Sequence, residues 1–299
     1  MTQKNNIDGI LLLDKPTMMS SNQAIQRIKK KFNINKLGHT GTLDPLATGL
    51  LPVCMGRATR VSQFLIDSDK TYQATIRLGI KTSTGDKEGE IIEKAPYDIP
   101  NAGSKIGEIL ESFIGKQNQI PPMFSALKHK GQRLYKLAAK GIDIQRKPRS
   151  IHIHSIHLIS FESDCLELII ECSKGTYIRT LAEDIAAKLN TVGHIDQLRR
   201  SNIKCFNEQS MFTLEEIISS EIIEPFLLPM DTPLKHFIKT KVSESESSMF
   251  SNGLSISKNL NSIDGDHYIR VYDAKSIFLG LAQYSDGFLK PKMVFNNTN

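Results

Sequence analysis

Long hydrophobic runs are missing from this sequence of 299 residues. The longest early run is Ile10-Leu11-Leu12-Leu13, and Asp14 ends it. A signal-peptide core needs about 7–15 apolar residues and a membrane helix about 20. The run therefore predicts neither feature, and we expect a soluble, cytoplasmic protein that has no membrane partner.

Cysteine is also scarce. The four cysteines, none of them in a C-x-x-C pair, are Cys54, Cys165, Cys172 and Cys205. In a long chain without a secretion signal we expect reduced thiols in or near the core, and the spacing predicts no zinc site. Internal repeats of about 20–50 residues are absent as well, which excludes solenoids and propellers.

Positive charge is present and is unevenly distributed. The net charge is +6 and the pI is near 9.0. Between residues 128 and 149 only Asp143 is acidic, and eight residues are basic: Lys128, Lys130, Arg133, Lys136, Lys140, Arg146, Lys147 and Arg149. Such a concentration is expected of a phosphate-binding surface, and the alternative is a solvated lysine-rich helix and loop.

Local patterns predict short strands and helices in an irregular order. Ser20 or Ser21 is placed to cap a helix from Asn22 to about Phe32. Residues 71–78 alternate as a strand, and residues 38–52 read as a glycine-punctuated loop. The other expected elements are strands at 10–13, 151–161 and 166–172, and helices at 107–113, 131–140 and 180–189. Because no regular βαβ period is present, the pattern favours an α+β sheet over a doubly wound one.

The amino-acid composition and the pattern of predicted elements change after Leu234. Residues 241–263 are rich in Ser and Asn, and no long helix is evident after them. Strands are expected at 268–272, 277–284 and 288–295, with a hairpin signal at Asp286-Gly287. We therefore expect two domains, 1–234 and 235–299, of which the second is a small all-β domain.

The segment from Gly38 to Val53 is the most distinctive part of the chain. Its glycines permit positive φ or close backbone approach, and Pro45 keeps Asp44 out of the α region. Taken alone, an Asp-Pro pair is usually a turn. The segment matches neither the P-loop nor the dinucleotide-binding fingerprint, so nucleotide hydrolysis is poorly supported.

The stretch from Gly38 to Gly49 resembles the catalytic motif of the bacterial tRNA pseudouridine-55 synthases of the TruB type. Segments 12–16, 70–72, 121–128, 172–181 and 198–200 match the same family in order, so the resemblance covers about residues 8–235. The tail is similar to a PUA RNA-binding domain. One departure is Phe124, where tyrosine is expected; the missing hydroxyl concerns a peripheral contact.

The resemblance implies a fold and an activity. The fold would be a mixed pseudouridine-synthase sheet with flanking helices, followed by a small PUA-like barrel. The activity would be isomerisation of uridine 55 in the T-loop of tRNA, on a target base turned out of its stack. The reaction consumes no water and exchanges no electrons, so no cofactor is expected. The resemblance also implies a monomer that contacts the T-arm and the acceptor stem.

The resemblance carries roles onto individual residues. Asp44 corresponds to the catalytic aspartate, and Arg179 to the arginine that pairs with it and would lower its pKa. Tyr72 corresponds to the active-site tyrosine, whose ring can stack on uracil and whose hydroxyl can assist proton loss from C5. The positions expected to contact the substrate are His39, Tyr72, Tyr177 and Leu198. Without the resemblance, Arg179 would read as a surface arginine, Tyr72 as a strand residue and Leu198 as core.

Two rival functions and one rival site remain open at this point. A non-catalytic RNA-binding module explains the charge and the tail but leaves the Asp44 loop without a role. A base-exchange transglycosylase would require a free base and would release another. His152, His154 and His157 raise the question of a metal, but no nearby cysteine or carboxylate completes a ligand set, so a surface role is expected.

Overall fold

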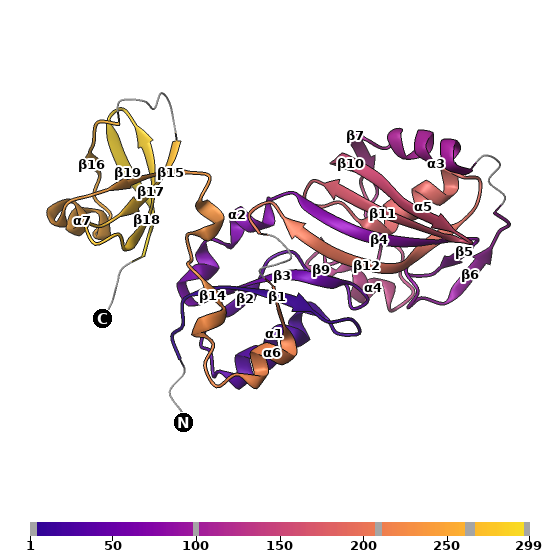
Figure 1. Ribbon diagram of the computed structural model, residues 1–299, viewed down its shortest axis with the longest axis horizontal. Helices are drawn as coiled ribbons and strands as arrows, with labels where there is room; N and C mark the ends of the chain where they lie inside the picture. Colours follow the sequence, from indigo (N-terminus) through magenta and orange to yellow (C-terminus); the bar gives the residue numbers. More distant parts are fainter. Residues whose placement is uncertain (1–4, 98–101, 207–210, 261–266, 296–299) are drawn as a thin grey trace.

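The computed structural model describes residues 5–97, 102–206, 211–260 and 267–295, and these form two main β-sheets (Figure 1). The larger sheet runs β13-β1-β3-β12-β4-β11-β10-β7, with β14 beside β1 and β2 beside β3. The C-terminal sheet runs β15-β17-β18-β19-β16. The expected α+β class, with a second, smaller β-rich unit, is confirmed.

The larger sheet mixes parallel and antiparallel pairs. β3 pairs antiparallel with β1 and parallel with β12, and β12 pairs antiparallel with β4. Its strands are β1 (Gly9–Lys15), β2 (Leu37–His39), β3 (Thr48–Met55), β4 (Lys70–Leu78), β7 (Gly115–Gln119), β10 (Arg149–Glu162), β11 (Cys165–Cys172), β12 (Gly193–Ile203), β13 (Phe212–Thr213) and β14 (Leu227–Leu228). Two small hairpins lie outside it, β5 (Ile80–Thr82) with β6 (Ile91–Lys94), and β8 (Lys128–His129) with β9 (Gln132–Arg133).

Helices flank both ends of the larger sheet. Figure 1 shows α1 and α6 beside the end that holds β1, and α3 and α5 toward the end that holds β10 and β11. The α-helices here are α1 (Ser21–Lys31), α2 (Ser62–Ile66), α3 (Ala102–Glu111), α4 (Leu134–Ala138), α5 (Ile178–Lys188) and α6 (Leu214–Ser219), and the 3₁₀ helices are η1 (Gly56–Arg60), η3 (Glu224–Phe226) and η4 (Thr232–Leu234). No helix in the described part of the chain is long and apolar enough to cross a membrane.

Several elements follow directly from local chemistry. Ser20 caps α1 with a complete capping box, in which its hydroxyl accepts from the Gln23 amide and the Gln23 side chain accepts from the Ser20 amide. β4 alternates between buried and less buried positions, with Tyr72 on the buried face as expected. The strands expected at 151–161 and 166–172 pair as the β10–β11 hairpin.

Other expectations were wrong. The loop expected at 38–52 is interrupted by the buried strand β3, which begins at residue 48, because apolar residues fill the run although it contains Gly49 and Pro52. β12 was not anticipated at all. The helix expected at 131–140 is shorter, since only α4 is helical there. The preceding residues form the β8–β9 hairpin instead. A short helix, α7 (Glu244–Ser251), occupies the Ser-rich stretch, where Ser243 provides a capping box.

The C-terminal sheet packs against the larger sheet through apolar side chains. Its strands are β15 (Ile238–Lys241), β16 (Ile256–Ser257), β17 (His267–Tyr272), β18 (Phe278–Ser285) and β19 (Phe288–Val294). Leu281, Met293 and Phe295 join one buried cluster with residues of β1 and β3, and this cluster includes Leu234. The Arg60 guanidinium lies 5.0 Å from the centre of the Phe295 ring. The boundary expected at Leu234 therefore lies inside a shared hydrophobic cluster.

Candidate active site

The loop that carries Asp44 connects β2 to β3, and side chains from distant segments hold its backbone. The Ser21 hydroxyl accepts a hydrogen bond from the Leu43 amide and donates one to the Leu43 carbonyl, both at 2.9 Å. Lys15, fully buried, donates to the Pro45 carbonyl at 3.2 Å. These bonds fix the residues on either side of Asp44, so the direction of its side chain is set by the first turn of α1 and the end of β1.

Arg200 of β12 holds the two ends of the same loop. Its guanidinium donates to the carbonyls of Gly41 at 2.8 Å and Leu50 at 2.7 Å, and the side chain is 1% exposed. Gly41 has φ +68°, and a Cβ there would lie 3.1 Å from Nη1 of Arg200. At Gly49, with φ +95°, a Cβ would lie 2.3 Å from the Arg200 carbonyl oxygen. Both positions thus require glycine because the chain passes so close to Arg200.

Arg179 lies in the first turn of α5, and each nitrogen of its guanidinium contacts a carboxylate or a backbone carbonyl. Its Nε is 2.9 Å from the Asp44 carboxylate and 3.8 Å from that of Asp86. Its two terminal nitrogens donate to the carbonyls of Thr84 at 2.8 Å and Phe124 at 2.7 Å. A guanidinium offers several donors in one plane, so one buried side chain joins three separate loops. The Phe124 contact uses the backbone, so it does not depend on a tyrosine hydroxyl at that position.

Opposing influences act on the pKa of Asp44, and their net effect raises it. Burial raises the pKa of Asp44; the adjacent Arg179 guanidinium lowers it, and the Asp86 carboxylate raises it again. Arg179 lowers this pKa as expected, but lost hydration and a second carboxylate outweigh the ion pair, so the net shift is upward. The side chain still has 39% of its surface exposed, toward the cavities that it lines.

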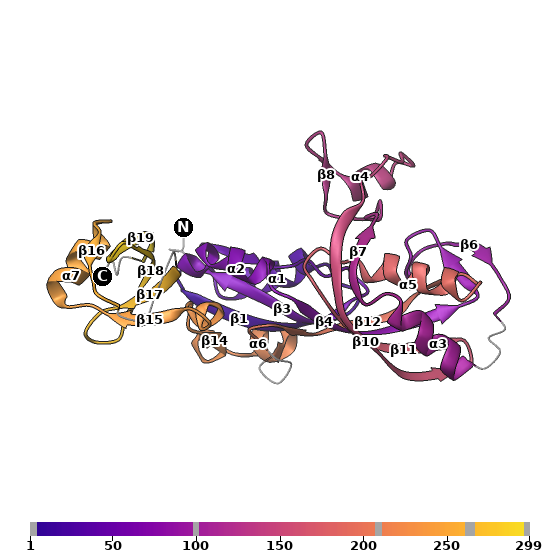
Figure 2. The same cartoon turned by 90° about the horizontal axis from the view of Figure 1, so that it is seen from above.

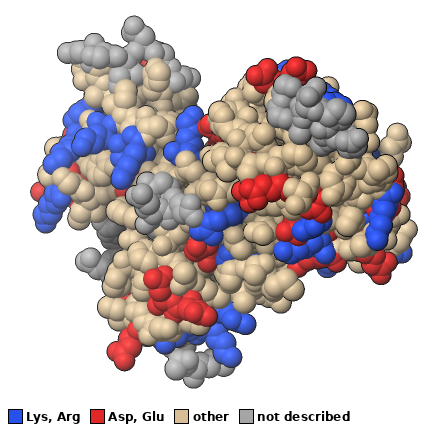
Figure 3. Space-filling model, turned by 45° about the vertical axis from the view of Figure 1, so that its right-hand side comes forward, with Lys and Arg blue, Asp and Glu red and all other residues tan. Residues whose placement is uncertain are grey.

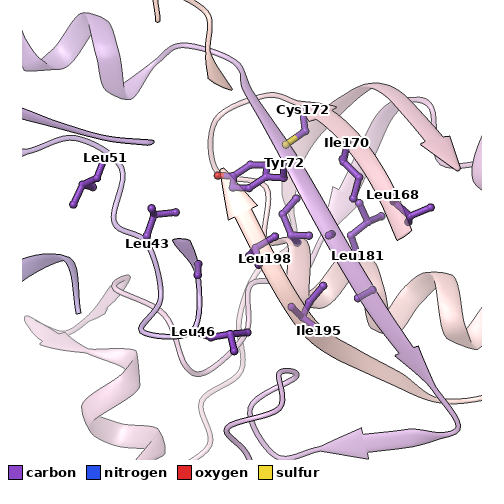
Figure 4. Close-up of a cluster of buried hydrophobic side chains, with 14 of the residues drawn as sticks. Leu43, Leu46, Leu51, Tyr72, Leu168, Ile170, Cys172, Leu181, Ile195 and Leu198 are labelled. Carbon is purple, nitrogen blue, oxygen red and sulfur yellow. The ribbon is translucent and has the colours of Figure 1, made fainter. Parts of the chain in front are cut away.

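A cavity of about 510 Å³ opens at Asp44 and brings together most of the residues expected at the site. Asp44, Tyr72, Arg179, Tyr177 and Leu198 all line it. Tyr72 and Leu198 are 9% and 8% exposed. Figure 4 shows the Tyr72 ring next to Cys172 and Leu198, with its hydroxyl directed to the side on which Leu43 lies. The apolar surfaces of Tyr72 and Leu198 beside one carboxylate suit a flat, uncharged ring.

The two tyrosines of this cavity are held in the neutral form. Burial raises the pKa of the Tyr72 phenol, and the adjacent Arg200 guanidinium opposes that shift. Burial also raises the pKa of the Tyr177 phenol. The Tyr177 backbone is fixed by Gln119, whose side-chain amide accepts from the Tyr177 amide at 2.8 Å and donates to its carbonyl at 3.0 Å.

His39 lies apart from that group. It lines an adjoining cavity of about 710 Å³, which shares Asp44 and Arg179 with the first. Burial lowers the pKa of His39, and Arg200 acts in the same direction, so the ring is neutral at neutral pH. Its Nδ1 is buried and has no hydrogen-bond partner among the described residues. A neutral ring that lines the cavity is able to contact a polar group that enters it.

The basic segment 128–149 forms an arm that leaves the body of the molecule. In Figure 2 the β8 hairpin and α4 stand out from the plane of the sheets, above the larger one. Arg133 of the arm lines the His39 cavity, and Arg149 at its base lines the Asp44 cavity. The segment is therefore more than a solvated helix and loop, because its charge reaches the rim of both cavities.

The three strand histidines do not form a metal site. His152 and His154 have ring centres 4.7 Å apart, and Nε2 of His154 is 3.3 Å from the Asp69 carboxylate. In the described part of the chain, no group of three or more His, Cys, Asp or Glu side chains is arranged to hold a metal ion.

Sequence reasoning missed three residues of the site. The sequence predicts only a helix cap at Ser21. It identifies Lys15 and Arg200 only as parts of segments that match the family. The pattern around them contained a partial signal, since a lysine inside an apolar strand and paired arginines at residues 199 and 200 are unusual core residues. Their hydrogen-bond partners lie far away in the sequence, so no local pattern predicts these contacts.

Comparison with known proteins gives the family. Residues 29–178 match the N-terminal domain of the TruB family pseudouridylate synthases, and residues 179–235 match the tRNA pseudouridylate synthase B C-terminal domain. Residues 239–295 match the C-terminal region of pseudouridine synthase II TruB. The chain belongs to the TruB family of pseudouridylate synthases. It is therefore an enzyme, an isomerase, as the resemblance implied.

Curated relatives extend the match over nearly the whole chain. A protein of Methylobacillus flagellatus named tRNA pseudouridine synthase B is 44% identical over 292 residues, which cover 97% of this chain and 95% of the relative. One of the same name from Shewanella woodyi is 42% identical over 300 residues, covering 96% and 93%.

Solved structures support the fold. A structure described as a Cbf5-Nop10-Gar1 complex superposes with a TM-score of 0.70 at 26% identity, covering 92% of this chain and 78% of that one. A second, an H/ACA RNP bound to a substrate RNA containing 2'-deoxyuridine, gives 0.71 at 22% identity and covers 97% and 86%.

Proposed function

We propose that this protein converts uridine 55 in the T-loop of tRNA to pseudouridine, with Asp44 as the catalytic carboxylate. The observation that carries the proposal is the Asp44–Arg179 ion pair at the edge of a cavity that is also lined by Tyr72 and Leu198. Family membership supports pseudouridylation, and the curated relatives are named as enzymes that act on tRNA.

The reaction is a balanced isomerisation. The N1–C1′ bond breaks, the uracil turns, a C5–C1′ bond forms, N1 gains a proton and C5 loses one. A carboxylate can begin this by attack on C1′, by attack on C6 or by removal of a proton from C2′. Its raised pKa makes Asp44 a better base and nucleophile than an ordinary aspartate, and Arg179 keeps it oriented.

The other cavity residues have separate roles in this proposal. The Tyr72 ring stacks on the uracil, and its hydroxyl assists the loss of the C5 proton. Leu198 and Tyr177 form walls of the same cavity. His39 contacts the turned-out nucleotide from the adjoining cavity without taking part in the chemistry. The target must leave its stack, because C1′ and C5 are inaccessible in a closed T-loop.

The rest of tRNA would lie along the basic parts of the protein. The arm 128–149 contacts the T-arm backbone, where it extends from the rim of the cavities. The C-terminal sheet also presents basic side chains, as Figure 3 shows at its left, and β15 and β19 contribute exposed Lys239, Lys241, Lys290 and Lys292. We assign residues 1–234 to the chemistry and 235–299 to binding near the acceptor stem, in a cytoplasmic monomer.

The test uses the Asp44→Asn substitution, since asparagine preserves shape but loses the base and nucleophile. The expected result is normal binding of unmodified tRNA with no pseudouridine at position 55, mapped by carbodiimide labelling. Single-turnover conversion at the rate of the unaltered protein would remove Asp44 from the mechanism. The mass of the RNA separates the rival chemistry, because pseudouridine and uridine have the same mass, whereas base exchange changes it. A failure of the unaltered protein to convert any uridine would favour a non-catalytic RNA-binding module.

A further inference from the structure

Another cavity, of about 680 Å³, lies where the C-terminal sheet meets the larger one. We call it the junction cavity; its lining residues that matter here are Phe64, Asp67, Asp69, Lys204, Lys235 and Tyr268. It is separate from the Asp44 cavity, but the two lie on opposite sides of one short segment. Ile66 and Lys70 line the Asp44 cavity, whereas Phe64 and Asp67 line the junction cavity.

Aromatic rings form one wall of the junction cavity. The Phe64, Phe237 and Tyr268 ring centres are 5.4–6.0 Å apart, and the His236 ring lies 3.9 Å from Phe237. Tyr268 remains 43% exposed, although the other rings pack on it. An aromatic ring held in place by its neighbours, with one surface open, is the platform on which nucleic-acid bases stack.

The charges around the cavity favour an anion. Of the two carboxylates on its wall, Asp67 is paired with a lysine, Lys174, at 2.7 Å, and Asp69 lies 3.3 Å from Nε2 of His154. Lys204 and Lys235, in contrast, form no ion pair with any residue in the described ranges. Two exposed ammonium groups beside an open aromatic face match a phosphate and a base.

We infer that the junction cavity binds one unpaired nucleotide of the RNA substrate, with its base on Tyr268 and its phosphate between Lys204 and Lys235. The inference rests on the proposed function, because it concerns an RNA that is engaged at both Asp44 and the C-terminal sheet. The junction cavity would provide a specific contact with one nucleotide between the Asp44 cavity and the C-terminal sheet. Surface charge alone would give only a nonspecific electrostatic attraction.

The experiment exploits the absence of tryptophan from the sequence. Tyr268→Trp places a single indole at the cavity, and Phe288→Trp places one at an equally exposed position, also 43%, on the same sheet outside the cavity. At saturating unmodified tRNA, we expect quenching of indole fluorescence in Tyr268→Trp and little change in Phe288→Trp. Equal responses, or no response in Tyr268→Trp, overturn the inference.

Affinity provides the second measurement. Tyr268→Ala should weaken binding of whole tRNA by about five- to 100-fold, the usual effect of removing one stacking platform. Phe288→Ala should leave it unchanged, and Tyr268→Phe should retain it. Replacing Lys204 and Lys235 together by Gln should reduce the slope of log affinity against log salt by about one to two. Unaltered affinity in Tyr268→Ala contradicts the inference.

Two controls keep the outcomes apart. Urea unfolding of Tyr268→Ala shows whether the substitution destabilises the protein by disrupting the aromatic cluster. If it does, the fluorescence response of Tyr268→Trp to tRNA becomes the test of the nucleotide site. The proposed function is judged separately by pseudouridine formation in the same tRNA by the unaltered protein. Normal conversion combined with no effect at Tyr268 refutes only the nucleotide site. Absent conversion refutes the proposed function whatever the fluorescence shows.

Discussion

Ser21 provides the sharpest test of how the fold holds the catalytic loop. Its hydroxyl makes both hydrogen bonds available to the Leu43 backbone, and it is 1% exposed. In Ser21→Ala, the Leu43 amide and carbonyl lose these partners in a buried place. Each unpaired group costs about 1–3 kcal/mol, so the free energy of unfolding should fall by about 2–4 kcal/mol if the loop relaxes in part.

The neighbouring residue is a matched control. Ser20 caps α1 and, within the described part of the chain, makes no hydrogen bond to the Asp44 loop, so Ser20→Ala should cost about 1 kcal/mol of stability. Its effect on turnover should be small. Ser21→Ala should also reduce turnover, because a displacement of about 1 Å at a reacting group can reduce the rate about 100-fold.

Two assays measure these effects. Urea unfolding gives the stability of each variant, and single-turnover conversion of tRNA labelled with tritium at uridine C5 gives the rate. We expect Ser21→Ala to reduce the single-turnover rate at saturating enzyme by about 10- to 100-fold. The reasoning is refuted if Ser21→Ala is as destabilised as expected but retains the turnover of Ser20→Ala, since the loop would then hold Asp44 without Ser21.

Three further predictions concern the cavity itself. Tyr72→Phe should lose much more rate than tRNA affinity, because the ring that stacks remains; a normal rate in single turnover would limit Tyr72 to stacking. The rate should fall as the pH decreases through the raised pKa of Asp44, at a higher pH than for an ordinary aspartate, and a pH–rate profile of single turnover checks this. Arg179→Gln removes the cation that opposes the shift, so the acid limb of that profile should move to higher pH and kcat should fall; an unmoved limb would mean that the limb does not belong to Asp44.

Part of the fold was readable because it depends on near neighbours in sequence. The Ser20 cap, the alternation of β4 and the β10–β11 hairpin each follow from residues a few positions apart. β3 is not predicted by local patterns, because Gly49 and Pro52 have low strand propensity. The strand forms nevertheless, since it pairs with its neighbours in the sheet. β12 was missed although Leu198 was recognised as an important position.

The sequence by itself determined the local elements and, through a long and specific motif, the position of Asp44 in the chain. Only the tertiary structure decided what surrounds that carboxylate: Arg179 from α5, Ser21 from α1 and Arg200 from β12. It also decided the sign of the pKa shift at Asp44, which the ion pair alone would have reversed. The physical reason is that hydrophobic periodicity reports which face of an element is buried, whereas desolvation and hydrogen bonding depend on groups that the chain brings together only when it folds.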